Sequence, residues 1–458
     1  MPPLLQRDDI FLSKKNLGRI SLQTEYEKIY NSEHVWNKIV TNDGTVANID
    51  PLIPIAATIS EISSDLIFGE FPRIDMGQAV GAWEKIGREY FNIGRSFEVD
   101  LLEASVQTSA IGMVWWTIWR KDEKTWWSFV KPQKTAWESD FFGLTMWRLF
   151  EEIDRDVNKK SITYSIKEYD KRKDGVWYVE YDVVIAVDTQ KVKGIGDLIV
   201  EEKLEFDFIP VIPVYNIKVL NCDVGRSDYQ GKQQLLAEID NRVDQINFVL
   251  QEHGDPWLLI PSGILDKYGR FHRSQGKLIE KSAAAAGIDN TVDITTWDAS
   301  LSSAFQQIDN LIRLVYATSR ISSALSPFAD MSGGNAESGR SLKWRSVTTI
   351  SMINRKRLYW EMAIRMFCHY MSKIEPTMKN LDAVNMKIEW PDGLPVDDDT
   401  FIDTIAMRVR EGLLDRVEAI RRIEDTDAAE AQKMADKIGA EKTEEADISA
   451  RRLGGATF

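Results

Sequence analysis

Ser227-Asp228-Tyr229-Gln230 begins the stretch, residues 227–371, that decides the fold. The Ser hydroxyl can accept the backbone N–H three residues on, and the Gln can reach back to the cap, so the tetrapeptide predicts a helix start. Apolar residues then recur at three- and four-residue steps: Leu235, Leu236, Ile239, Val243, Ile246, Val249 and Leu250. This spacing predicts a buried stripe, with Asp240 and Asp244 on the opposite, polar face.

Two more helices are predicted in this stretch. The first helix ends near Gly254, and a return helix from Asp298 shows helical apolar spacing up to Tyr316. Between them, the apolar run Trp257–Pro261 indicates a small β-rich tip. A glycine-rich loop covers 326–335. A long, basic helix is expected from Ser338, with these residues spaced for burial: Leu342, Val347, Ile350, Ile353, Trp360, Ile364, Phe367 and Met371.

The N-terminal half predicts helices followed by β-hairpins. Apolar spacing indicates a first helix within 1–44, a helix over 52–67, and two amphipathic helices separated at 92–94. The period then changes to that of strands at 112–120 with 126–130, and at 162–169 with 177–181. The many tryptophans suit a base-stacking platform, but large aromatics that fill a sheet face against helices are the simpler interpretation. The fold class is therefore α+β.

Composition narrows the function. The chain has 57 Lys and Arg against 71 Asp and Glu, a net charge of −14, so it is not a general DNA binder. The balance is compatible with a channel through which DNA slides without sticking. Cys222 and Cys368 lie far apart, which favours buried thiols over a disulfide. The N-terminus lacks the pattern of a signal peptide and no apolar run is long enough for a membrane span, so we expect synthesis in a cytoplasm.

No catalytic, cofactor or metal constellation is recognisable, so we expect no enzyme. The segments 225–233 and 269–278 miss the spacing and the hydroxyl of a phosphate-binding loop. His34, His253, His272 and His369 are scattered without ligand spacing. Asp397-Asp398-Asp399 suits Mg²⁺, yet carboxylates before a helix more often serve its N-terminal dipole.

A family resemblance rests on three segments in this order. Gly225–Tyr229 opens a helix that contains Ile239-Asp240-Asn241, Ser338–Lys343 opens the long helix after the glycine-rich loop, and Ile388–Asp392 leads into an acidic helical segment. Over roughly residues 50–440 the chain resembles the portal proteins of tailed bacteriophages and prophages. The resemblance divides it into wing (1–225 and 338–395), first stem helix (226–254), clip (255–297), second stem helix (298–322), tunnel loop (323–337) and crown (396–458).

The resemblance implies a dodecameric ring at one capsid vertex of the virion, through which double-stranded DNA is packaged and ejected. The large terminase is expected to dock on the clip, where head–tail adaptors replace it, while capsid and scaffolding proteins surround the ring. It implies a channel lined by stem carboxylates and by the tunnel loop: Asp240, Asp244, Asp309, Pro327, Phe328, Met331 and Asn335. It implies clip docking through Lys267, Arg270, Arg273 and Lys277.

The residues alone leave alternatives open. The three aspartates equally suit an ordinary solvated helix face, the 326–335 segment a plain inter-helix loop, and the basic tip a solvated hairpin. A cytoplasmic helical scaffold without a ring, or a nucleic-acid enzyme that uses Mg²⁺ without a recognisable motif, would also fit the composition.

Overall fold

The computed structural model describes residues 11–33, 36–40, 46–49, 53–121, 123–141, 143–187, 191–219, 224–254, 257–261, 278–281, 293–295, 301–322, 325, 344–391, 398–424, 426 and 430–440. Two compact units divide the chain. One comprises 1–329 with 346–393, and the other comprises 330–345 with 394–458. The first unit holds both stem helices and every sheet described here.

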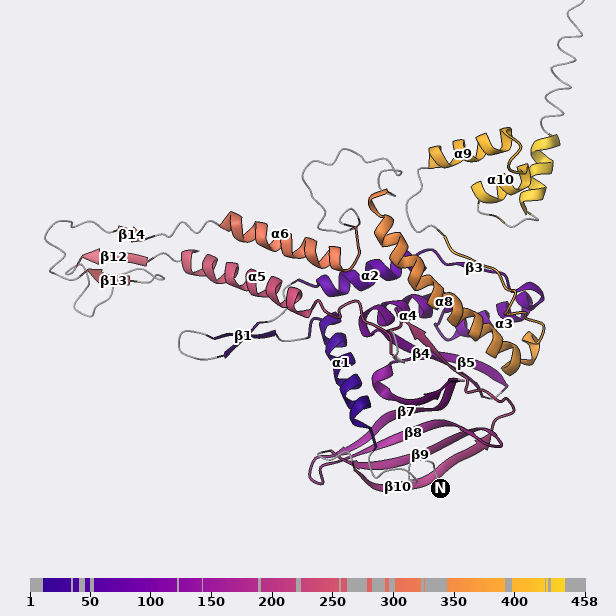
Figure 1. Cartoon of the computed structure of the whole chain (residues 1–458), viewed down its shortest axis with the longest axis horizontal. Helices are drawn as coiled ribbons and strands as arrows, with labels where there is room; N and C mark the ends of the chain where they lie inside the picture. The colour runs from indigo at the N-terminus through magenta and orange to yellow at the C-terminus, as the bar shows by residue number, and fades with distance from the viewer. Residues whose placement is uncertain are drawn as a thin grey trace, which may run out of the picture. The chain divides into compact units, whose positions relative to one another are not determined.

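Two antiparallel sheets form most of the β part of the first unit (Figure 1). A three-stranded sheet has the order β11-β4-β5, made of Val211–Tyr215, Met113–Lys121 and Lys124–Val130. A five-stranded meander has the order β10-β9-β8-β7-β6, made of Val192–Lys203, Gly175–Ala186, Ser161–Arg172, Gly143–Asp156 and Thr135–Asp140. Both predicted hairpins, β4–β5 and β8–β9, are confirmed.

Within these two sheets, four strands were not apparent from the sequence: β6, β7, β10 and β11. Strand β7 ends in Glu-Glu-Ile-Asp-Arg-Asp, and β10 carries two glycines and several charged residues, so neither shows a clear apolar alternation. Their partners in the sheet decide their conformation, because strand propensity depends on cross-strand context. Strand β9 extends beyond the predicted 177–181 at both ends.

Helices α2 (Ile55–Phe68), α3 (Val80–Asn92), α4 (Phe97–Ile111) and α8 (Val347–Ile374) surround an aromatic core. The break predicted at 92–94 is confirmed. Trp116 of β4 stacks on Phe367 of α8 with ring centroids 4.1 Å apart, and Trp127 of β5 stacks on Tyr90 at 3.6 Å. Both tryptophans are fully buried. The interpretation of the tryptophans as core rather than as a stacking platform is therefore confirmed for these two residues.

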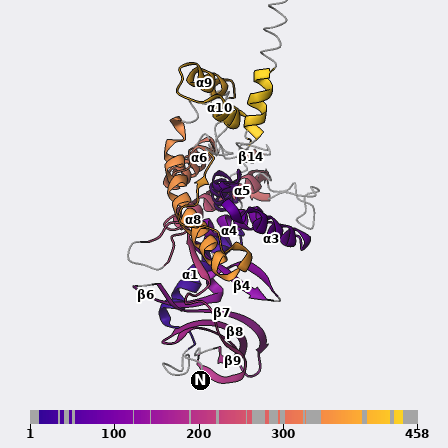
Figure 2. The same ribbon diagram turned by 90° about the vertical axis from the view of Figure 1, so that its right-hand side faces the viewer.

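Helix α1 (Lys14–Tyr30) joins the five-stranded sheet to the helical core (Figure 2). Leu17 and Ile20 pack with the apolar cluster of the sheet, while Tyr26 and Ile29 belong to the main core. Its Ser13 cap accepts the N–H of Asn16 at 3.2 Å. Two short strand pairs also belong to this unit. Strand β1 (Trp36–Val40) pairs with β2 (Val46–Ile49), and β3 (Arg73–Ile74) pairs with β15 (Ile388–Glu389).

The two stem helices, α5 (Gln233–Gly254) and α6 (Leu301–Thr318), pack side by side (Figure 1). Between them in sequence lie β12 (Trp257–Pro261), β13 (Leu278–Lys281) and β14 (Asp293–Thr295), which form a sheet of order β13-β12-β14. The predicted helical pair with a small β-rich tip is thus confirmed. Phe305 is 52% exposed, although its spacing predicted burial.

Helix α8 begins at Val347, and the start predicted at Ser338 lies outside the described residues. Ile353, Trp360, Ile364, Phe367 and Met371 are buried as predicted. Val347 is 50% exposed and not buried. Lys356 and Arg357, which the sequence placed on a basic surface, are 1% and 7% exposed.

The second unit contains α9 (Asp398–Arg410), α10 (Arg416–Ile423) and a helical segment over 430–440. Gly412 separates α9 from α10 with a φ of +71°, a conformation that favours glycine. Asp415 caps α10 by accepting the N–H of Val417 at 3.2 Å. Leu413 is 77% exposed because it follows this break.

Candidate functional site

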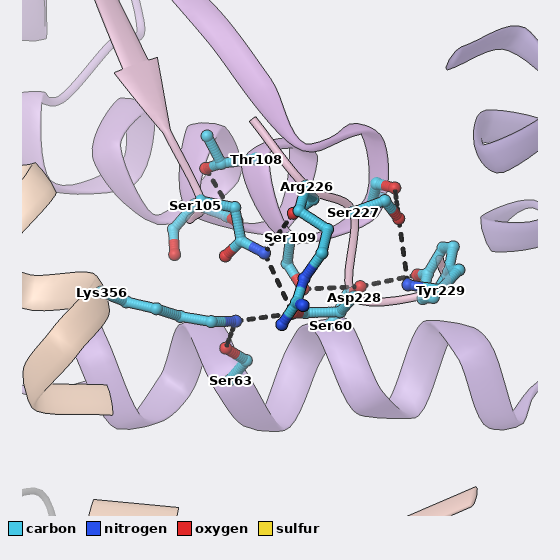
Figure 3. A network of polar contacts seen from close by, with 12 residues as sticks. Ser60, Ser63, Ser105, Thr108, Ser109, Arg226, Ser227, Asp228, Tyr229 and Lys356 are labelled. Atoms are coloured by element: carbon cyan, nitrogen blue, oxygen red, sulfur yellow. Dashed lines mark hydrogen bonds and ion pairs between the residues drawn. The ribbon is translucent and has the colours of Figure 1, made fainter. Parts of the chain in front are cut away.

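A buried polar junction ties the start of the stem to the wing helices (Figure 3). Its centre is the Asp228 carboxylate, which accepts hydrogen bonds from Lys356 Nζ at 2.5 Å and from Ser109 Oγ at 2.6 Å. Its other oxygen accepts from Asn216 Nδ2 at 2.9 Å. These partners come from α8, α4 and the segment after β11. One carboxylate therefore links three elements that are distant in sequence.

The ion pair is secluded from solvent. The side chains of Lys356 and Asp228 are 1% and 13% exposed, and Lys356 Nζ also donates to Ser63 Oγ of α2 at 2.6 Å. Burial by itself would raise the pKa of Asp228, but the charge of Lys356 and the hydrogen bonds to the carboxylate outweigh it. The pKa of Asp228 therefore lies below its ordinary value.

Hydroxyl groups extend the junction toward α2. Tyr229 OH lies 2.6 Å from Ser60 Oγ and donates to the carbonyl of Ala56 at 2.9 Å. Ser60 Oγ in turn lies 3.0 Å from Ser109 Oγ, which bonds Asp228. Burial raises the pKa of Tyr229 well above its ordinary value, so its phenol stays protonated. Buried polar groups linked in this way favour one fixed arrangement of the helices that carry them.

Two glycines allow the backbones to meet at this point. A Cβ on Gly225 would lie 1.9 Å from the carbonyl oxygen of Gly112, and a Cβ on Gly112 would lie 2.4 Å from that of Gly225. Gly112 also has a φ of +100°, as the residue that ends α4. The glycine that begins Gly225–Tyr229 is therefore required by a close backbone approach.

The capping prediction for Ser227 is wrong. Helix α5 begins at Gln233, and 228–232 form turns. Ser227 Oγ donates to the carbonyl of Ala110 at 2.5 Å and accepts the N–H of Tyr229, two residues on, at 3.0 Å. Gly231, with a φ of +79°, separates this turn from the helix. The Ser227 hydroxyl and the Asp228 carboxylate instead bond to Ala110 of α4 and Lys356 of α8.

Catalysis is not what this arrangement supplies. A serine beside a lysine can act as a nucleophile only when the lysine is neutral and the hydroxyl can reach a substrate. Here Lys356 Nζ donates to the Asp228 carboxylate, and Ser63 is 1% exposed. Within the described part of the chain, no group of three or more His, Cys, Asp or Glu side chains is placed to hold a metal ion. The junction instead fixes the positions of α2, α4, α8 and the start of the stem.

The predicted channel residues occupy different environments. Asp309 is exposed on α6 and Asp244 is half-buried on α5. Asp240, predicted on the polar face, is 4% exposed, so that placement is wrong. It lies four residues after Leu236 and three before Val243, which puts it beside the apolar stripe. Pro327, Phe328, Met331 and Asn335, and the clip residues Lys267, Arg270, Arg273 and Lys277, lie outside the described residues.

Sequence reasoning missed Asp228 and Lys356 as partners, although a signal was present. Ile353, Lys356, Trp360 and Ile364 follow each other at three- and four-residue steps, so the lysine stands on the buried stripe of α8. A buried lysine needs an anionic partner. Which carboxylate supplies it cannot be read from spacing.

Comparison with known protein families gives a match over nearly the whole chain. A family model described as "Phage portal protein, SPP1 Gp6-like" matches residues 11–446. The chain belongs to this portal protein family. The resemblance seen in the sequence is thereby confirmed, and the family match covers nearly the whole chain. Comparison with curated protein sequences returns no match.

This chain is also similar to chains in solved structures, two of which follow. One is titled "Virion of native gene transfer agent (GTA) particle", with 10% sequence identity and a TM-score of 0.45, covering 90% of this chain and 94% of the other. The second is titled "Neck of native GTA particle computed with C12 symmetry", with 10% identity and a TM-score of 0.41, covering 81% and 89%.

Portal proteins are structural proteins of the phage particle. The polar junction described above likewise has a structural role, because it fixes the helices that it links. Among the described helices, none has both the length and the apolar character to cross a lipid bilayer.

Proposed function

We propose that this chain is the subunit of a dodecameric portal ring at one vertex of the capsid, made in the host cytoplasm, whose axial channel conducts double-stranded DNA during packaging and ejection. The observation that carries the proposal is the family match over 11–446, together with a helical pair that ends in a small sheet. A passive conduit needs no cofactor and no catalytic group.

The stem helices supply the channel wall in this proposal. Asp244 and Asp309 place carboxylates on α5 and α6, and a chain of net charge −14 repels phosphate overall. Acidic walls keep the duplex from binding tightly, because affinity for DNA comes chiefly from Lys and Arg that release counterions. Asp240 is left out of the wall because it is buried within the subunit. The loop with Pro327, Phe328, Met331 and Asn335 narrows the channel.

The tip acts as the docking platform. Its basic residues Lys267, Arg270, Arg273 and Lys277 give a positive surface to an otherwise acidic chain. The large terminase docks there during packaging and a head–tail adaptor replaces it afterwards, while capsid and scaffolding proteins hold the ring in the shell. Complementary charge on the partner would raise the rate of docking.

The junction gives the proposal its mechanical basis. A subunit that carries a moving duplex must hold its stem at a fixed angle to its wing. The bonds from Asp228 to Lys356, Ser109 and Asn216 fix the start of the stem to α8 and α4. A buried network of several hydrogen bonds resists small displacements better than apolar packing, because each bond has a preferred geometry.

Electron microscopy of the purified protein with mass determination tests the proposal. Dodecameric rings with a central hole wide enough for a duplex are expected. The decisive arm co-expresses the chain with capsid or scaffolding protein, because a lone portal subunit can remain unassembled. Particles without rings in that arm would exclude the channel and favour a helical scaffold. Divalent-dependent turnover of nucleic acid would favour an enzyme instead.

A further inference from the structure

A cleft between α1 and α4 has the features of a built binding site. Its volume is about 250 Å³. Glu27 and Tyr30 of α1 line one side, Glu103, Val106 and Gln107 of α4 line the other, and Lys131 closes one end. This volume is below the roughly 300–1,000 Å³ typical of small-molecule and cofactor sites. The cleft is therefore of a size for a single side chain.

Its polar groups are unevenly satisfied. Glu27 is paired with Lys131 and also accepts from Gln133 Nε2 at 3.1 Å. Glu103, on the exposed face, forms no hydrogen bond or ion pair with any residue that the structure describes. Gln107 Oε1 is buried and has no donor within the described part of the chain. Leaving a buried acceptor without a donor is unfavourable, so an occupant that donates a hydrogen bond at this position would be stabilised.

The chemistry of the occupant follows from these groups. The two free groups are both acceptors, so the occupant's head must donate. The Lys131–Glu27 pair is neutral overall, which leaves the single negative charge of Glu103 to be balanced by a monocation. The walls between are apolar, through Val106, Ile111 and the ring of Tyr30. An aliphatic stem with a cationic head, which is the form of an Arg or Lys side chain, meets all three conditions.

We propose that this cleft receives an Arg or Lys side chain from a neighbouring copy of the chain in the ring. The inference rests on the proposed function, because a ring places identical copies side by side at high effective concentration. Nucleic acid is a poor occupant, since phosphate would meet Glu103. The cleft then specifies subunit contact by one buried, charge-assisted hydrogen bond.

Charge reversal tests the role of the cleft. The Glu103→Lys variant places a cation where the neighbour's cation should enter. We expect the protein concentration at which rings half dissociate to rise about tenfold or more. The matched control is Glu84→Lys, which makes the same charge change at an exposed position of α3 whose side chain is 60% exposed. The control should move the midpoint less than about twofold. Equal shifts in both variants would overturn the proposal.

Photocrosslinking identifies the occupant. A benzophenone amino acid at position 103 is irradiated in rings assembled from a mixture of ¹⁵N-labelled and unlabelled chains. A crosslink between labelled and unlabelled peptides, at an Arg- or Lys-containing segment, is expected. Intact rings that yield only intrachain crosslinks would overturn the proposal. Failure to form rings even with scaffolding protein would instead refute the proposed function, and this inference with it.

A free cation is the competing occupant, and a third arm separates it. Ethylguanidinium is titrated into the monomer, and the melting temperature of wild type is compared with that of Glu103→Gln. Saturable stabilisation that depends on Glu103, in a protein whose rings show no crosslink between copies, would assign the cleft to a small cation. Absence of such stabilisation, with the crosslink present, supports the neighbouring copy.

Discussion

At the scale of single residues, Lys356 has the most important structural role in the junction. It is the only described residue that bonds both Ser63 of α2 and the Asp228 carboxylate. A buried ion pair is not by itself evidence of high stability, since desolvation offsets much of the attraction. The removal of one partner is different, because it leaves the other charge buried without compensation.

The Lys356→Met variant is therefore expected to lower the free energy of unfolding by about 3–5 kcal/mol. Denaturant titration measures the effect. Arg355→Met is the matched control, because Arg355 is the preceding residue of α8 and is exposed. It should change the free energy of unfolding by no more than about 0.5 kcal/mol. Similar losses in both variants would mean that Asp228 does not depend on Lys356.

The Asp228 carboxylate also predicts a dependence on pH. Its pKa is lowered in the folded state, so its stabilisation is fully present above the ordinary aspartate pKa near pH 4 and is lost as pH falls through the folded-state pKa. The difference in unfolding free energy between wild type and Asp228→Asn should be constant above about pH 5 and should shrink below about pH 4. A difference that persists unchanged to pH 2.5 would contradict this assignment.

At the scale of elements, the close approach between the end of α4 and the segment before α5 sets a geometric requirement. Gly112→Ala places a Cβ 2.4 Å from the Gly225 carbonyl oxygen and forces alanine into a positive φ. We expect a loss of about 2 kcal/mol or more in the free energy of unfolding. Gly225→Ala should act in the same direction.

Gly87→Ala is the control for these two variants. Gly87 lies inside α3, and a Cβ there meets nothing within 4 Å. Alanine in a helix interior gains up to about 1 kcal/mol over glycine, so this variant should be slightly more stable than wild type. Thermal unfolding of the three variants is measured in parallel. If the glycines at 112 and 225 are required by the close backbone approach, their alanine variants should melt at a lower temperature than wild type, whereas Gly87→Ala should melt at a higher one. A change of melting temperature in the same direction for all three variants would argue against this role of the two glycines.

At the scale of the whole molecule, the proposed acidic channel is open to a direct test. Asp309→Lys replaces a carboxylate with an ammonium group in every subunit of the ring, so duplex DNA should bind the rings more tightly at low salt. The affinity should also fall more steeply with salt, because each neutralised phosphate adds about −0.9 to the log–log slope. Asp403→Lys, at an exposed position of α9, is the control with the same net charge. Equal binding by both variants would remove Asp309 from the channel wall.

The sequence by itself determined the local elements of this protein. Apolar spacing was sufficient for α2, α3, α4, α6 and most of α8, and alternation was sufficient for β4, β5, β8 and β9. The order of Gly225–Tyr229, the glycine-rich loop and the acidic C-terminal segment was sufficient to indicate the portal family, later matched over 11–446. These features are local, so they can be recognised in the sequence without knowledge of the tertiary structure.

Only the tertiary structure decided what the charged residues do. Asp228 looked like part of a helix cap and Lys356 like a surface base, yet they form one buried pair across 128 positions of sequence. Asp240 looked solvated and is buried. The cost of burying a charge depends on which opposite charge and which donors arrive beside it, and those arrive from distant segments. Periodicity specifies a helix face, whereas the partner that meets that face is specified only by the packed fold.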